Sequence, residues 1–130
     1  MARLLVVDDN PAMRRLLEYH LLEAGYEVDL AEEGGSAIKA LLRRGYDLVV
    51  TDYQMPYLDG LGLAQAIKKD PKTSHLPIVV LTGYDGEDII ELTHGLRANY
   101  ISKSVPMDDI VIYIGRILER ETGMVAPRRS

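Results

Sequence analysis

A chain of 130 residues, 47% of them hydrophobic and 27% charged, suits one compact domain with a single core and leaves no room for a second. The net charge of −5 argues against binding to a nucleic-acid backbone, and the absence of cysteine excludes disulfides, thiolate nucleophiles and cysteine-ligated zinc. No apolar run approaches the ~20 residues that cross a bilayer. We therefore expect a soluble, cytoplasmic protein with neither a membrane nor a nucleic acid as partner.

Short apolar segments of strand length recur along the chain, and helical patterns lie between them. Strands are predicted at residues 4–7, 28–31, 48–51, 78–82 and 100–101. The first helix has Asn10 as its N-cap and Pro11 in its first turn, and Gly25 ends it. Pro106 is expected to start the last helix.

The helices are predicted from stripes of apolar residues at helical spacing. These stripes are Met13, Leu16, Leu17 and Leu21; Ala37, Ile38, Leu41 and Leu42; Leu63, Ala66 and Ile67; Ile89, Ile90 and Leu92; and Ile110, Ile114, Ile117 and Leu118. Five strands that alternate with five helices require parallel pairing with right-handed crossovers. The sequence therefore predicts an α/β fold with a doubly wound, five-stranded parallel sheet.

Polar residues follow the apolar segments where the predicted strands end. Asp8 and Asp9 follow the first strand, Asp52 follows the third, Thr82 ends the fourth, and Lys103 comes shortly after the fifth. Ligands of open α/β sheets bind beyond the carboxyl ends of the strands. We therefore expect these side chains to meet at one edge of the sheet.

Three carboxylates at one edge would repel one another strongly. Adjacent strand ends bring Asp8, Asp9 and Asp52 within roughly 5 to 7 Å, and two unit charges at ~5 Å repel by about 3 kcal/mol at an effective dielectric near 20. Lys103 supplies one positive charge, which cannot balance three negative ones. All-oxygen ligands favour Mg²⁺ or Mn²⁺ over zinc, and a phosphate group would complete such a site and pair with the ammonium.

Four motifs, taken in order, resemble the receiver domain of bacterial two-component response regulators, including the chemotaxis type. They are VVDDN at 6–10, TDYQMPYLDG at 51–60, VVLTG at 79–83 and YISK at 100–103. The resemblance covers roughly residues 2–121 and implies a flavodoxin-like (βα)₅ fold with strand order 2-1-3-4-5. It assigns residues 1–122 to the domain and 123–130 to a tail or the start of a linker.

The resemblance implies that Asp52 is the phosphoacceptor, which would take a phosphoryl group from a phosphohistidine. It implies that Asp9, Asp52 and the backbone carbonyl of Gln54 bind the metal ion, with Asp8 acting mostly through water. The metal would reduce the repulsion between Asp52 and the incoming phosphoryl group.

The resemblance also implies a phosphoryl-binding pair and a conformational switch. Thr82 and Lys103 would bind phosphoryl oxygens, and Thr82 would move towards the phosphoryl group while Tyr100 turns inward. This movement would change the face formed by the fourth helix, the fifth strand and the fifth helix. Gln54 and Tyr84 occupy the positions that tune the lifetime of the acyl phosphate, and the bulk of Tyr84 is expected to slow its hydrolysis.

The implied partners are a sensor histidine kinase or a phosphotransfer protein, and a downstream effector protein. A phosphorylation-dependent dimer is also left open. The chain would catalyse only its own phosphorylation and dephosphorylation, so it would not be an enzyme acting on a separate substrate.

The sequence departs from the family pattern at three places. Ser104 follows Lys103 where the family usually has a proline in a cis peptide, so the direction of the ammonium is open. Leu96 and Arg97 replace a small Gly-Ala pair, and Gly83 stands where alanine or another small residue is usual. These changes concern the switching geometry more than the phosphorylation.

Three other functions compete with the phosphoacceptor hypothesis. A pseudo-receiver would bind partners without being phosphorylated. A phosphatase of the haloacid-dehalogenase type would need a second aspartate at the position of Gln54, and a flavodoxin-like FMN carrier would need a hydroxyl- and glycine-rich loop in place of Asp8 and Asp9. The acidic residues make each of these weaker than the receiver hypothesis.

Overall fold

The chain forms five strands and five helices that alternate along the sequence. A computed structural model describes residues 1–83, 87–125 and 127. The strands are β1 (Arg3–Val7), β2 (Glu27–Ala31), β3 (Leu48–Asp52), β4 (Ile78–Thr82) and β5 (Asn99–Ser102). The helices are α1 (Pro11–Glu23), α2 (Gly34–Arg43), α3 (Gly60–Lys69), α4 (Glu87–Gly95) and α5 (Met107–Thr122). In the described part of the chain, no helix combines the length and the apolar character that a membrane span requires.

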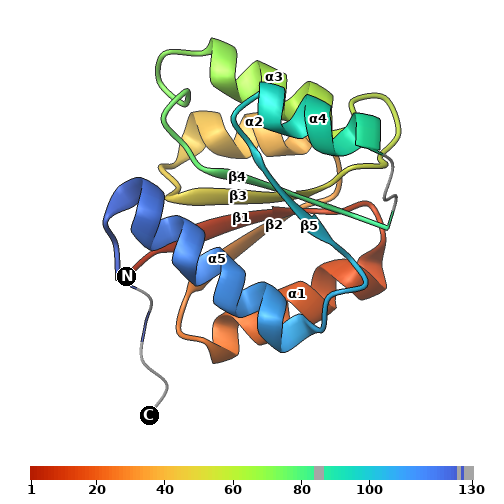
Figure 1. Cartoon of the computed structure of the whole chain (residues 1–130). Coiled ribbons are helices and arrows are strands. Elements are labelled where there is room, and N and C mark those ends of the chain that lie inside the picture. The colour runs from red at the N-terminus through yellow and green to blue at the C-terminus, as the bar shows by residue number, and fades with distance from the viewer. Residues whose placement is uncertain (84–86, 126, 128–130) are drawn as a thin grey trace.

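The strands form one parallel sheet in the order β2-β1-β3-β4-β5, which confirms the predicted class and topology. Helices α1 and α5 lie on one face of the sheet, and α2, α3 and α4 lie on the other (Figure 1). The order reverses direction between β1 and β3, because the chain leaves β1 towards β2 and later returns to the opposite side. This reversal is the switch point at which ligands bind in open α/β sheets.

Each face of the sheet has its own buried core. Leu4, Val6 and Val50 pack with residues of α1 and α5, whereas Leu5 and Val49 pack with residues of α2 and α3. All residues of β3 and β4 are buried, as the unbroken apolar segments predict for internal strands. Burial on both faces holds the central strands, and the polar residues at their ends, in fixed positions.

Three residues of the predicted apolar stripes are exposed and do not face the core. Leu16, Leu42 and Leu92 are 45%, 73% and 55% exposed, although the pattern placed each on a core-facing stripe. Successive helical residues are about 100° apart, so Leu16 cannot face the sheet together with the buried Leu17. In α4 the inward positions are Ile89 and Thr93, whose hydroxyl donates to the Ile89 carbonyl.

The predicted helix boundaries agree closely with the structure. Asn10 is the N-cap of α1, because its Oδ1 accepts a hydrogen bond from the Met13 N–H at 3.0 Å. Gly25 follows the end of α1 with a φ of +96°, where glycine is favoured. Pro106 is the N-cap of α5 and not its first helical residue.

Backbone hydrogen bonds align the carboxyl ends of the strands. The Asp8 N–H donates to the Ala31 carbonyl of β2 at 3.1 Å, and the Lys103 N–H donates to the Thr82 carbonyl of β4 at 2.9 Å. Asp52 lies beside Leu81 in the register of β3 and β4. The polar residues at the strand ends therefore share one edge of the sheet.

Candidate functional site

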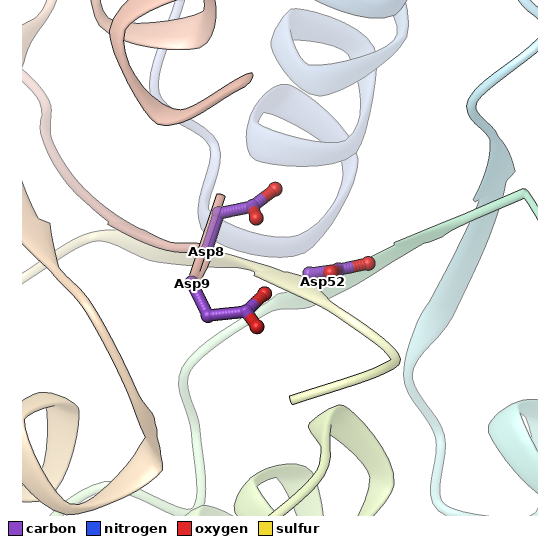
Figure 2. A group of neighbouring side chains, drawn as sticks. All are labelled: Asp8, Asp9 and Asp52. Atoms are coloured by element: carbon purple, nitrogen blue, oxygen red, sulfur yellow. The ribbon is translucent and has the colours of Figure 1, made fainter. Parts of the chain in front are cut away.

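The three aspartates at this edge form a compact cluster. One carboxylate oxygen from each of Asp8, Asp9 and Asp52 lies within 4.8 Å of the others. Asp8 and Asp52 are buried and Asp9 is exposed. Figure 2 shows Asp8 and Asp9 at consecutive positions after β1, with their carboxyl groups turned to the side on which Asp52 lies. The cluster predicted from the strand ends is therefore present, and it is tighter than the predicted separation.

Lys103 joins the cluster from the loop after β5. Its Nζ lies 2.9 Å from Asp52 Oδ1 and 3.7 Å from Asp8 Oδ2. The described residues contain no cis peptide bond, so the Lys103–Ser104 bond is trans. The ammonium thus reaches Asp52 without the proline that the family usually has at position 104.

Asp8 is the most deeply buried carboxylate of the three. Burial raises its pKa, and the charges of Asp52 and Asp9 act in the same direction, whereas the Asn10 N–H and Lys103 oppose them. Asp8 Oδ1 accepts the Asn10 N–H at 2.9 Å. Its Oδ2 is buried and has no hydrogen-bond partner among the described residues, although the Lys103 ammonium is nearby.

The donor set of this cluster fits a hard divalent cation. It consists of oxygen atoms, and one of them, Asp8 Oδ2, receives from the described residues no hydrogen bond of the kind that a buried polar atom normally has. Oxygen-rich sites of this kind suit Mg²⁺. Acidic groups also occur at protein surfaces without a metal, so the burial of two of the three carboxylates is the informative feature.

The other predicted site residues lie around the cluster. Gln54 and Asp9 line one shallow hollow, together with Tyr53, Met55, Pro56 and Asp59. Thr82 is buried at the end of β4. Tyr100 is half-buried and lines a separate groove beside α5. Tyr84 lies outside the described residues. The roles predicted for these side chains stay predictions.

Two residues that support the site were not predicted. A Cβ added to Gly60 would lie 2.3 Å from the carbonyl oxygen of Asp52, so only glycine allows α3 to start this close to β3. The Arg14 guanidinium donates a 2.8 Å hydrogen bond to the carbonyl of Asp8. In the sequence, Gly60 appears only as the last residue of the motif at 51–60, and no local signal marks Arg14, because its contact depends on the folding of the turn.

A doubly wound parallel sheet that gathers three aspartates and a lysine at its carboxyl edge has the architecture of the receiver class of signalling domains. Residues 4–115 match the family model of the response regulator receiver domain. The chain therefore belongs to this family, as the four sequence motifs indicated.

Relatives of known name support this assignment. The chain is 37% identical to the response regulator PleD of Caulobacter vibrioides over 113 residues, which are 86% of this chain and 24% of PleD. It is 31% identical to the chemotaxis protein CheY of Pseudomonas aeruginosa over 123 residues, covering 93% of this chain and 99% of that protein. The chain thus corresponds to about a quarter of PleD but to nearly all of CheY.

A solved structure of a relative agrees with the fold. The response regulator TrrA of Thermotoga maritima, solved in complex with Mg²⁺-BeF, is 37% identical and superposes with a TM-score of 0.80. The match covers 90% of this chain and 99% of that one.

Proposed function

We propose that this receiver domain accepts a phosphoryl group on Asp52 from a phosphohistidine of a sensor histidine kinase or a phosphotransfer protein. The observation that carries this proposal is the convergence of Asp8, Asp9 and Asp52 with Lys103, whose Nζ is 2.9 Å from Asp52 Oδ1. A site for a dianionic phosphoryl group needs such positive charge.

Asp9, Asp52 and the backbone carbonyl of Gln54 are the proposed ligands of Mg²⁺, or of Mn²⁺, with Asp8 acting mostly through water. When bound, the cation would offset the negative charge of the carboxylates and of the incoming phosphoryl group. The Mg²⁺-BeF complex of TrrA, a relative with 37% identity, supports this proposal. So does the buried Oδ2 of Asp8, which accepts no hydrogen bond from the part of the chain that the structure describes.

In the proposed transfer, a carboxylate oxygen of Asp52 attacks the phosphorus atom of the phosphohistidine. A P–O bond forms, the P–N bond breaks, and the departing imidazole nitrogen takes up a proton. Thr82 donates its hydroxyl to one phosphoryl oxygen and Lys103 pairs with another, so both hold the group as it arrives. The chain acts only on its own phosphorylation state.

The proposed output is a change of the face formed by α4, β5 and α5. Tyr100 lines a groove on this face together with Tyr113 and Arg116. Movement of the buried Thr82 towards a phosphoryl group would free space for the Tyr100 ring and reshape the groove. A downstream effector, or a second copy of the chain in a phosphorylation-dependent dimer, would bind the altered face in the cytoplasm.

Acetyl phosphate tests the proposed reaction without a partner protein. After incubation with acetyl phosphate and Mg²⁺, the intact mass of the full chain should increase by one phosphoryl group. Asp52→Asn should abolish this increase, whereas Asp70→Asn, at the far end of α3, should retain it. A wild-type chain that folds and binds Mg²⁺ but gains no mass would instead support a pseudo-receiver that binds partners unphosphorylated.

A further inference from the structure

We propose that Arg14 is a positioning residue that holds the Asp8–Asp9 turn in the geometry that binds the divalent cation. This inference rests on the metal site of the proposed function. Arg14 lies in the first turns of α1, and its side chain is only 14% exposed. It touches none of the proposed metal-binding oxygens, so it would act through the backbone.

The contacts of Arg14 connect two loops at the edge of the sheet. Its Nη1 donates to the carbonyl oxygen of Asp8 at 2.8 Å, and its Nη2 lies 3.9 Å from Glu32 Oε1, in the loop after β2. The Arg14 N–H also donates to the Asn10 carbonyl at 3.0 Å. The planar guanidinium therefore fixes the start of α1 against the turn that carries the acidic residues.

The hydrogen bond to Asp8 determines the orientation of Asp9. The carbonyl of Asp8 and the N–H of Asp9 belong to one planar peptide unit, so a donor fixed on that carbonyl restricts rotation of the unit. The Asp9 side chain is exposed and, among the described residues, accepts no hydrogen bond and forms no ion pair of its own. Its carboxylate is therefore directed mainly by the backbone that Arg14 holds.

A positioning role and a purely electrostatic role of Arg14 predict opposite changes in Mg²⁺ affinity when the residue is replaced. A cation near the cluster repels Mg²⁺, so removing its charge alone would tighten Mg²⁺ binding. Loss of the hydrogen bond to Asp8 would instead release the turn and weaken binding. The sign of the change in affinity therefore identifies the role of Arg14.

Calorimetric titration of the full chain with MgCl₂ at constant ionic strength, without a phosphodonor, provides this measurement. We expect Arg14→Met to weaken Mg²⁺ binding by at least about fivefold, as changes to groups that orient metal ligands usually do. Arg15→Met is the matched control, because it removes the same charge from an exposed neighbour. That variant should bind Mg²⁺ as tightly as the wild type or slightly more tightly.

Circular dichroism and thermal melting in EDTA show whether each variant is folded. A folded Arg14→Met protein that binds Mg²⁺ as well as Arg15→Met would overturn the inference. If Arg14→Met does not fold, Arg14→Lys replaces it: weaker binding than in the wild type supports the positioning role, and equal affinity contradicts it. A wild-type chain without affinity for Mg²⁺ would refute the metal site and this inference together, whereas equal affinities in the wild type and in Arg14→Met refute this inference alone.

Discussion

Lys103 controls the charge balance of the acidic cluster, because its ammonium contacts both buried carboxylates. We expect Lys103→Gln to tighten Mg²⁺ binding, since the cation no longer competes with an ammonium 2.9 Å from Asp52 and 3.7 Å from Asp8. The lysine side chain is 26% exposed, so solvent screening reduces the repulsion to about 1 kcal/mol, or roughly a fivefold change in Kd.

The same substitution should slow phosphorylation by acetyl phosphate, because the ammonium would also stabilise the incoming phosphoryl group. Calorimetry with MgCl₂ and the time course of the intact mass measure the two effects separately. Lys69→Gln, at the far end of α3, is the control with the same loss of charge. Equal Mg²⁺ affinity in Lys103→Gln and Lys69→Gln would show that the Lys103 charge has no special relation to the site.

The charged residues of the site could be predicted because strand ends of a parallel sheet must converge. Asp8, Asp52 and Lys103 each follow an apolar segment, and the structure brings all three together. The residues that hold them, Arg14 and Gly60, could not be predicted in the same way. Their importance depends on contacts with carbonyl oxygens that only the folded backbone brings near them.

The helices and strands can be predicted from local sequence patterns. Which residues of a helix are exposed cannot be predicted in this way. Adjacent leucines such as Leu16 and Leu17 give the same apolar signal, and only the position of the sheet decides which is buried. The left-handed backbone of Arg97, with a φ of +56°, was likewise not predicted. Its N–H donates to the carbonyl of His94 in the turn that leads from α4 into β5, where glycine would be the usual residue.

The junction between β3 and α3 depends on the small size of Gly60. We expect Gly60→Ala to lower the free energy of unfolding by about 2 kcal/mol, because the new methyl group would meet the Asp52 carbonyl and force the backbone to shift. This shift would move the Asp52 carboxylate, so Mg²⁺ binding should weaken as well. Urea denaturation and MgCl₂ calorimetry measure the two effects.

Gly45→Ala is the matched control for this prediction, since no atom of the described residues lies within 4 Å of the added Cβ. We expect that variant to unfold at the same or a slightly higher urea concentration than the wild type. A Gly60→Ala protein that keeps wild-type stability and Mg²⁺ affinity would show that the junction has room to adapt.

In the molecule as a whole, apolar burial in the two cores offsets the electrostatic repulsion among the three aspartates. The central strands are buried on both faces, which leaves their carboxyl ends no freedom to move the aspartates apart. The fold therefore retains an unfavourable concentration of negative charge at its functional site, as proteins commonly do where function requires it. A bound cation should reduce this repulsion and so raise the free energy of unfolding of the entire domain.

We therefore expect Mg²⁺ to stabilise the folded chain and Asp9→Asn to remove most of this stabilisation. At a Mg²⁺ concentration about ten times its Kd, binding to the folded state alone adds about 1.4 kcal/mol, which raises the melting temperature by about 5 °C for a domain of this size. In EDTA, Asp9→Asn should melt at the same temperature as the wild type or higher, because one repelling charge is gone. Melting curves by circular dichroism, with NaCl at matched ionic strength as the control, measure these shifts. An equal effect of Mg²⁺ on both proteins would mean that the cation acts by general screening and that the aspartates do not form its site.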